Sequence, residues 1–421
     1  MIFSLLFFFL FSLTASAQQA ILCGQLIDGT GNPAQANQAI LIEGERITGI
    51  VNQQRIPENY EVTDLREFTV LPGLIDAHVH PLIYGDNYQL NHLQNSSADK
   101  ALYGLKTVQN WLNEGWTTLR IAGDADVHYA PFAIRDAINQ GLFTGPRIYG
   151  AGHYISISGG GGDINYLAPE HQVTPDGLIV NGVEEMRKAV RQEIKYGSDW
   201  IKLLVTGAFM SAGDNPQNVH FSDEEIKVAI EEANRRGVPV MAHAHSTEGI
   251  NRAIELGVRS VEHGSFMNDR SIELFLEHEV YLVPTMAVGA FLVEEYGDSE
   301  AQSKSVKLHL KYDKDIQAML SKAIEAGVKI GVGSDNVGFP PGFACREFEE
   351  LVKLGMTPMQ AIEAGTRVNA ELLGKENDLG TIEAGKYADI IATRNNPLEA
   401  IQALQDVIFV MKGGKVIKPV R

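Results

Sequence analysis

Short apolar segments alternate with amphipathic helical patterns from residue 73 to residue 333, and this alternation constrains the fold more than any other feature. Residues 222–236 are one such helical pattern, since Ser222 and Glu225 can form a capping box at its start. Most of the segments are apolar on both faces, as the strands of a parallel sheet covered by helices are. Eight such segments separated by helices predict an α/β fold, a (β/α)8 TIM barrel. They are residues 73–78, 117–122, 147–152, 200–206, 239–243, 260–263, 280–284 and 329–333.

The two ends of the chain instead contain short strand patterns separated by turns. These patterns cover residues 20–27, 38–43 and 46–51 near the start, and residues 385–392, 407–411 and 415–417 near the end. Two β-rich ends that flank a barrel predict one small β-sandwich domain built from both. We therefore divide the chain into a leader (1–17), the first part of the sandwich (18–70), the barrel (71–374) and the second part of the sandwich (375–421).

The first residues have the pattern of a secretory signal peptide. Residues 2–14 are apolar and uncharged, and Ala15 and Ala17 form a small-x-small cleavage site. The apolar stretch is shorter than the ~20 residues that cross a bilayer as a helix. Since no Lys or Arg precedes it, an uncleaved anchor is the alternative. We expect cleavage after Ala17 and a secreted or periplasmic (bacterial) protein.

Charge and cysteine content exclude several kinds of partner and site. With 35 basic and 53 acidic residues the formal net charge is -18, whereas nucleic acids and anionic membranes bind basic patches. We expect neither as a partner of the mature chain. Export would permit a Cys23–Cys345 disulfide, but we expect two unpaired buried thiols. Two cysteines cannot form a thiolate zinc site, so any metal must be bound by nitrogen and oxygen, which directs attention to the 12 histidines.

Histidines and one aspartate stand at the ends of the predicted strands, where barrel enzymes carry their chemistry. His78 and His80 are two residues apart on an extended segment, so their imidazoles face the same side and can bind one metal together. His243 and His263 end the fifth and sixth segments, Asp335 follows the eighth, and His245 shares a face with His243. Imidazoles and a carboxylate without thiolate suit zinc or a similar divalent ion.

Lys202 lies inside the fourth apolar segment, where a charged side chain is unfavourable unless it is paired or modified. Three interpretations are open: a structural lysine, a lysine that forms a Schiff base, and a lysine carboxylated by CO2 that bridges two metal ions. The third requires histidines from other strands to face Lys202. Four histidines, one lysine and one aspartate at five strand ends are difficult to explain by packing alone.

Two motifs resemble those of the amidohydrolase superfamily. Residues 71–80 read LPGLIDAHVH, like the opening motif of that family, and residues 380–389 read GTIEAGKYAD, like its C-terminal signature. The resemblance covers essentially the whole mature chain. The segments around Lys202, His243 and His263 resemble the imidazolonepropionase-like branch, which includes binuclear Xaa-Pro dipeptidases, Xaa-Arg/Lys carboxypeptidases and ochratoxin-hydrolysing amidases.

The resemblance implies roles for individual residues. His78 and His80 would bind the more buried of two divalent ions, and Asp335 would bind the same ion and handle the proton. Lys202, N-carboxylated, would bridge the two ions. His243 and His263 would bind the second ion. His245 stands where many relatives have a tyrosine that polarises the substrate carbonyl, and it could take that role.

One loop departs from the family pattern, which leaves strict prolidase specificity in doubt. Residues 158–163 read SGGGGD, so Gly161 stands where dipeptidase relatives carry a histidine for substrate. The glycine amides could bind a substrate carboxylate. His153 and His220 are the possible substitutes for the missing histidine, although a neutral residue at the rim is the better expectation for each. Arg120 and Arg147 are candidate carboxylate partners, although a structural role is the better expectation for each arginine.

The predicted function is hydrolysis of an amide in a dipeptide or N-acyl amino acid, including ochratoxin A-type amides, by a hydroxide that bridges two metal ions. One alternative is a mononuclear cyclic-amide hydrolase or deaminase of the same fold, which would not need Lys202 as a bridge. Another is a non-catalytic binding protein, although such proteins usually lose metal ligands. By resemblance we also expect a homo-oligomer.

Overall fold

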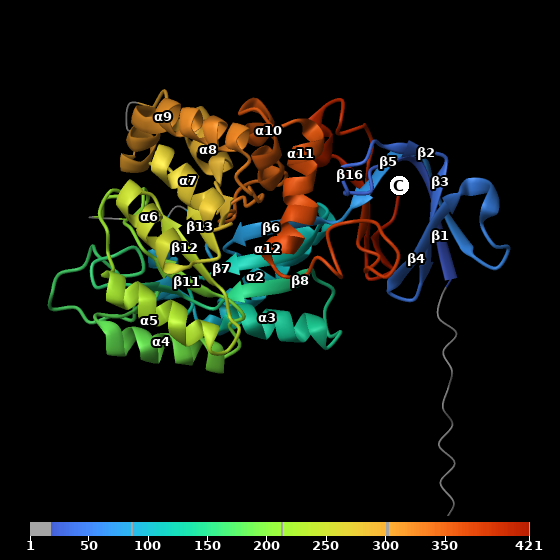
Figure 1. Cartoon of the computed structure of the whole chain (residues 1–421). Coiled ribbons are helices and arrows are strands. Elements are labelled where there is room, and N and C mark those ends of the chain that lie inside the picture. Colours follow the sequence, from blue (N-terminus) through green and yellow to red (C-terminus); the bar gives the residue numbers. More distant parts are fainter. Residues whose placement is uncertain (1–17, 86, 212–213, 300–302, 421) are drawn as a thin grey trace, which may run out of the picture.

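A computed structural model shows the arrangement of residues 18–85, 87–211, 214–299 and 303–420 (Figure 1). The predicted leader, residues 1–17, lies outside the described residues. The barrel strands are β6 (Leu74–Val79), β7 (Trp116–Ala122), β8 (Arg147–Ala151), β11 (Ile201–Leu204), β12 (Val240–Ala244), β13 (Ser260–His263) and β14 (Tyr281–Val283). Pairing is parallel from β6 to β8 and from β11 to β14. The predicted barrel is confirmed, because each of these strands overlaps one predicted segment.

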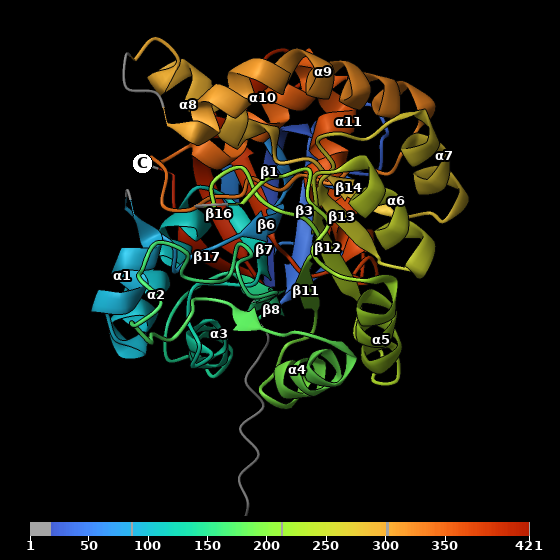
Figure 2. The same cartoon turned by 90° about the vertical axis from the view of Figure 1, so that its left-hand side faces the viewer.

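The helices surround the strands, as Figure 2 shows in a view onto the barrel. They are α1 (Tyr88–Gln94), α2 (Ser97–Asn113), α3 (Ala130–Asn139), α4 (Val183–Lys195), α5 (Asp223–Asn234), α6 (Thr247–Leu256), α7 (Asp269–Glu277), α8 (Met286–Tyr296), α9 (Lys304–Ala326), α10 (Arg346–Lys353), α11 (Pro358–Glu363) and α12 (Asn369–Leu372). The predicted capping box of α5 is present, since the Ser222 hydroxyl accepts from Glu225 N and the Glu225 carboxylate accepts from Ser222 N.

The eighth predicted segment closes the barrel, although it forms isolated bridges rather than a continuous strand. Ile330 bridges to β14 and Asn336 bridges to β6. Asp335 N donates to His78 O at 2.8 Å, which continues the contact with β6. A Cβ at Gly333 would come within 2.3 Å of Val283 and 2.7 Å of His78, so only glycine allows the backbones to approach this closely.

Both ends of the chain form one mixed eight-stranded sheet beside the barrel (Figure 1). Its strands are β1 (Gln18–Leu26), β2 (Gln35–Ala36), β3 (Gln38–Glu43), β4 (Arg46–Asn52), β5 (Glu61–Pro72), β15 (Ile390–Thr393), β16 (Val407–Lys412) and β17 (Lys415–Lys418). β5 joins the halves, since it pairs with β1 on one side and β15 on the other. Hydrogen bonds therefore link all strands of the predicted sandwich into a single sheet. This sheet has its own apolar core, which includes Ile21, Ile40, Leu65 and Phe409.

Several shorter elements complete the fold. β9 (Tyr154–Ser156) and β10 (Leu178–Ile179) extend the sheet beside β11. The short helical turns are η1 (Gln53–Arg55), η2 (Phe343–Cys345), η3 (Ala364–Val368) and η4 (Ile401–Gln405). Cys23 and Cys345 are buried free thiols, as predicted. Within the described ranges, no helix combines the length and apolarity needed to span a membrane.

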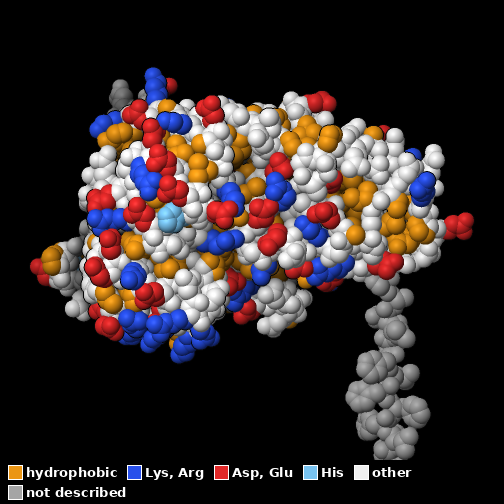
Figure 3. All heavy atoms as spheres, viewed as in Figure 1, with side chains coloured by type: hydrophobic (Ala, Val, Ile, Leu, Met, Phe, Trp, Pro, Cys, Tyr) orange, Lys and Arg blue, Asp and Glu red, His pale blue; other side chains and the backbone are white. Residues whose placement is uncertain are grey.

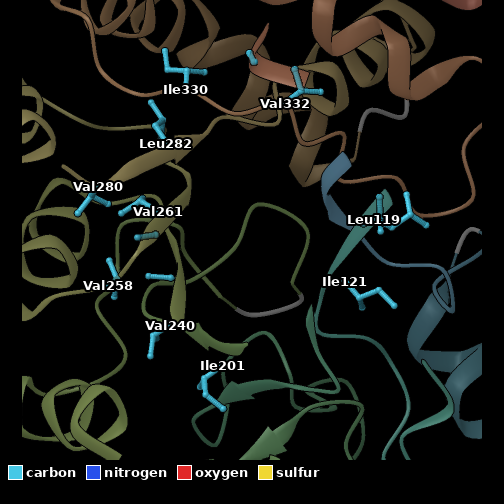
Figure 4. Close-up of a cluster of buried hydrophobic side chains, with 14 of the residues drawn as sticks. Leu119, Ile121, Ile201, Val240, Val258, Val261, Val280, Leu282, Ile330 and Val332 are labelled. Atoms are coloured by element: carbon cyan, nitrogen blue, oxygen red, sulfur yellow. The ribbon is translucent and has the colours of Figure 1, made fainter. Parts of the chain in front are cut away.

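Successive side chains along each barrel strand face alternately the apolar layer outside the barrel and its polar interior. Leu119, Ile201, Val261 and Leu282 belong to the apolar cluster in Figure 4. Side chains at neighbouring positions, such as Arg120, Lys202 and Glu262, point to the other side of their strands. Parallel strands of a barrel thereby carry polar residues inward without interrupting the outer core. On the surface, acidic and basic side chains are interspersed over the face in Figure 3.

Candidate active site

Two groups of potential metal ligands form at the strand ends. His78, His80 and Asp335 make up the first ligand group, and His243, His245 and His263 the second ligand group. In each group the potential ligand atoms lie within 4.8 Å of one another. The groups are neighbours, since the rings of His78 and His263 have centroids 5.1 Å apart. The structure therefore brings together the histidines and the aspartate that the sequence predicted as ligands.

Local backbone geometry helps to aim two of these residues. His263 has φ 73° and Asp335 has φ 51°, in the left-handed region that non-glycine residues seldom occupy. Each residue stands where a strand ends and the chain turns away. Such strain persists only where the surroundings impose it, and it is frequent at functional sites.

The first ligand group is supported by buried charges. His78 Nδ1 lies 2.7 Å from Glu262 Oε2, and the Arg120 guanidinium donates to both oxygens of Glu262 at 2.9 Å. Burial alone would raise the pKa of Glu262, but Arg120 and His78 lower it well below its usual range. The ionised Glu262 therefore accepts a hydrogen bond from His78 Nδ1–H, which leaves His78 Nε2 free as a ligand.

His80 and Asp335 complete the first ligand group. His80 Nδ1 lies 2.5 Å from Gly123 O, which can only accept a hydrogen bond, so Nδ1 carries a proton and Nε2 faces the site. Asp335 Oδ1 lies 3.2 Å from His80 Nε2 and 3.6 Å from His78 Nε2. Burial would raise the pKa of Asp335, but the two histidines and Lys202 lower it overall. The Asp335 carboxylate is therefore ionised and can bind a cation or accept a proton.

The second ligand group is supported by neutral groups. His263 Nδ1 lies 2.7 Å from Thr285 Oγ1, and His245 Nδ1 lies 2.8 Å from Ser265 Oγ. His243 Nε2 donates to Gly207 O at 3.2 Å, which leaves Nδ1 free as a ligand. Burial lowers the pKa of His245 to about 3, so its imidazole is neutral.

Lys202 lines the same cavity as both ligand groups. Its side chain is 1% exposed, yet its amine forms no hydrogen bond or ion pair with any other described residue. Burial lowers the pKa of Lys202 to about 8, which increases the share of the neutral, nucleophilic amine. A buried amine without a partner is the feature that carboxylation, and the bridging role predicted for Lys202, would explain.

The cavity beyond the ligands is mostly apolar. Its apolar walls include Leu204, Phe209, Met286, Val288, Ile316 and Val337. Tyr88 and Tyr154 line another part, where the Tyr154 hydroxyl donates to Asp176 at 2.5 Å. His309 and Asp313 of α9 also face the cavity. A site of this kind accepts an apolar group and orients it with a few polar contacts.

The structure separates the three residues predicted to bind substrate. Gly161 lines the cavity, whereas His153 and His220 do not. His153 Nδ1 lies 2.6 Å from Glu193 Oε1 in a buried cluster, and His220 Nε2 lies 3.1 Å from Asp214 Oδ1. Each ring is therefore held by a carboxylate outside the cavity, which makes neither a suitable replacement for the histidine absent at Gly161.

Both candidate arginines have structural roles, as we expected. Arg120 is fully buried beneath the ligands and pairs with Glu262. Arg147 donates to Asp389 of the C-terminal segment at 3.0 and 3.2 Å and lies over the Tyr387 ring. Arg147 thus connects the barrel to the terminal sheet, and neither arginine reaches the cavity.

Sequence reasoning missed several residues of the site. Glu262 immediately precedes a predicted ligand, so a buried carboxylate beside a histidine was an available signal. Thr285 and Ser265 carried no distinguishing pattern. His309 and Asp313 are four residues apart on α9, a spacing that places them on one helix face but is common on any exposed helix.

Comparisons with known proteins agree with this geometry. The sequence profile described as "Amidohydrolase family" matches residues 69–417. Ochratoxinase of Aspergillus niger is 34% identical over 426 residues, which cover 94% of this chain and 86% of that protein. Its crystal structure superposes with a TM-score of 0.85 and 30% identity, covering 96% of each chain.

Two other relatives share the fold or the sequence pattern. The crystal structure of a Xaa-Pro dipeptidase with methionine bound in its active site has a TM-score of 0.88 and 36% identity, covering 95% of this chain and 99% of that one. Imidazolonepropionase of Cutibacterium acnes is 24% identical, covering 85% of this chain and 83% of that protein. Together with the matching profile, these similarities connect the whole described barrel and sheet to one group of hydrolases.

Proposed function

This chain belongs to the amidohydrolase family, in its imidazolonepropionase-like branch, and from that premise we propose that it hydrolyses the amide bond of a dipeptide or an N-acyl amino acid. One observation carries the proposal: two ligand groups and Lys202 line a single cavity with apolar walls. Two relatives support this choice of bond. A Xaa-Pro dipeptidase cleaves the amide of a dipeptide, and the similarity to ochratoxinase supports an ochratoxin A-type amide.

The residues fit two divalent ions, zinc being our proposal. The first ligand group would hold one ion, and His243 and His263 the other. Carboxylated Lys202 would bridge them, because its amine lies close enough to interact electrostatically with His78, His243 and Asp335. When bound, two such ions supply a hydroxide nucleophile at neutral pH and polarise the scissile carbonyl.

The chain's own residues would move the proton and orient the substrate. Asp335 would accept the proton of the attacking water and return it to the leaving amine. His245 would donate from Nε2 to the substrate carbonyl, because Ser265 Oγ can donate to Nδ1 and fix that tautomer. The apolar walls would exclude water and hold the side chain of the substrate.

A mononuclear cyclic-amide hydrolase or deaminase is less well supported. It would leave Lys202 without a function, although Lys202 is buried and its amine has no partner among the described residues. A non-catalytic binding protein would not require six potential ligands to be retained.

The test is an assay of purified, zinc-loaded protein. It should be offered Xaa-Pro dipeptides, Xaa-Arg dipeptides, N-acyl-phenylalanine amides and ochratoxin A, with bound metal counted per chain. We expect the wild type to bind two ions per chain and to hydrolyse at least one amide class. Lys202→Ala should bind fewer ions and hydrolyse that amide more slowly. One ion per chain with full activity, or two ions with no amide hydrolysed, would contradict the proposal.

We also propose export of the protein through its N-terminal segment. The support is the apolar stretch at residues 2–14 followed by Ala15 and Ala17. N-terminal sequencing of the protein expressed with its full chain should find Gln18 as the first residue. An intact Met1 on protein retained in the membrane would favour the uncleaved anchor instead.

A further inference from the structure

Asp313 differs from the other residues that line the cavity. Among the described lining residues, only Lys202, Asp335 and Asp313 are lysine, arginine or acidic, and Lys202 and Asp335 belong to the proposed metal site. We infer that Asp313 binds a cationic group of the substrate, an ammonium or guanidinium, and so makes positively charged peptides the preferred substrates. This inference rests on the proposed function and deepens it, because that function leaves dipeptides and uncharged N-acyl amides equally possible.

A series of ring contacts links the helix that carries Asp313 to the second ligand group. The Phe209 ring meets His245 edge-on, with centroids 4.8 Å apart, and lies parallel to the His309 ring at 4.6 Å. Asp313 follows His309 by one turn on α9, so both side chains occupy the same helix face. The Asp313 carboxylate therefore lies one helical turn from the ring that stacks on Phe209, and Phe209 in turn meets the second ligand group through His245. It can contact the distal part of a substrate whose amide carbonyl lies beside His245.

The carboxylate of Asp313 is available to a ligand. Oδ2 accepts from Gln317 Nε2 at 2.6 Å, and Oδ1 has no hydrogen-bond partner among the described residues. No described lysine, arginine or histidine forms an ion pair with Asp313. A neutral amide donor orients this carboxylate without cancelling its charge.

Neighbouring groups do not supply the missing positive charge. His309 faces Asp313 on the same helix, but burial lowers its pKa to about 4, so the ring is neutral under ordinary conditions. Among the other lining residues, Phe209 and Gly289 lie against the His309 ring, and Ile316 belongs to α9. In such surroundings a carboxylate attracts a cation more strongly than it would in water and repels a substrate carboxylate.

Two substrate groups share the required chemistry: the α-ammonium of a peptide and the side chain of lysine or arginine. Matched substrates separate them. Peptides with and without an acetylated N-terminus test the α-ammonium, and lysine compared with norleucine tests the side chain. Each pair differs in charge. The lysine and norleucine side chains are also similar in size, whereas acetylation enlarges the N-terminus.

The experiment compares metal-loaded wild type with Asp313→Asn, using Asp315→Asn as the matched control. Asp315 is an exposed acidic residue on the same helix and does not line the cavity. For one or both pairs we expect the wild type to prefer the cationic member. Asp313→Asn should lower kcat/KM for that member about tenfold or more, mainly through KM, and change the uncharged member by less than twofold. Asp315→Asn should change neither. Calorimetric binding of lysinamide and norleucinamide should follow the same order.

Other results would overturn the inference. If the wild type hydrolyses uncharged amides without preferring a cation, or if Asp313→Asn affects both members of each pair equally, Asp313 is not a cation site, while the proposed function stands. If the metal-loaded wild type hydrolyses no amide, the proposed function and this inference fall together.

Discussion

The two ligand groups occupy one cavity but are supported in different ways. Behind the first ligand group lie buried, fully charged residues, since Glu262 pairs with Arg120 and holds His78. Behind the second ligand group lie hydroxyl groups and a backbone carbonyl, contributed by Thr285, Ser265 and Gly207. Charged residues therefore orient His78 in the first ligand group, whereas neutral hydrogen bonds orient His80 and the second ligand group.

This difference predicts unequal metal affinity and unequal tolerance of substitution. A buried ion pair is stable only while both partners are present, because removing one partner leaves the other as an uncompensated buried charge. A hydrogen bond from a hydroxyl contributes less, and water can replace it at modest cost. We expect the first ligand group to hold its ion more tightly and to depend more on its surroundings.

Glu262→Gln should have the largest effect, because it removes the negative charge that pairs with Arg120 and leaves one acceptor oxygen where Arg120 and His78 now share two. We expect a loss of about 3–5 kcal/mol in the free energy of unfolding. We also expect metal affinity at the first ligand group to fall about 10- to 100-fold. Chemical denaturation and metal analysis measure the two effects.

Glu255→Gln is the control for this substitution, because Glu255 is exposed on α6. It should leave stability and metal content unchanged. If Glu262→Gln instead kept native stability and bound both ions tightly, the charged residues behind the first ligand group would not set it apart from the second ligand group.

Asp335→Asn should separate metal binding from turnover within the first ligand group. The amide oxygen can still bind a cation, but it cannot take up a proton as the carboxylate does. We expect kcat to fall by about 10²- to 10⁴-fold, while most of the metal remains bound. Near-normal turnover would exclude Asp335 as the proton acceptor.

Thr285→Val should weaken the second ligand group only, by about tenfold in metal affinity. Valine keeps the shape of threonine but removes the hydroxyl that contacts His263. Titration with a chelator, followed by counting the remaining ions, should show earlier loss of one ion. Thr285→Ser, which keeps a hydroxyl, should have wild-type affinity. Equal loss of both ions from Thr285→Val would contradict the independence of the two ligand groups.

The smallest effect concerns Glu347 of α10, which supports the segment after Thr285. Its carboxylate accepts from Ala287 N at 2.8 Å, and burial raises its pKa from 4.5 to about 8. Between these pH values the unfolded chain loses this proton while the folded chain keeps it, so stability falls as the pH rises from 4.5 to about 8.

Glu347→Gln cannot ionise, and its stability should therefore decline less than that of the wild type as the pH rises from 4.5 to about 8. Thermal unfolding at several pH values measures the difference. Glu349→Gln, on the same helix, should follow the wild type. Parallel pH profiles for Glu347→Gln and the wild type would show that Glu347 does not titrate with folding.

Much of the fold and ligand set could be predicted because the signals are local. Strand segments, helical periodicity and the His-x-His spacing each depend on neighbours within a few residues. The side-chain alternation that turns Lys202 away from Ile201 and Leu203 follows from strand geometry alone. Similarly, β-rich ends on both sides of a barrel indicated the shared terminal sheet.

Only the tertiary structure decided which side chains meet. Glu262 and His78 are 184 residues apart in sequence, and Arg120 and Glu262 are 142 apart, so no local pattern connects them. His153 follows a barrel strand as predicted, but Glu193 turns its ring away from the cavity. Strand periodicity determines where a residue stands, whereas the direction and charge of its side chain depend on partners that folding brings from distant parts of the chain.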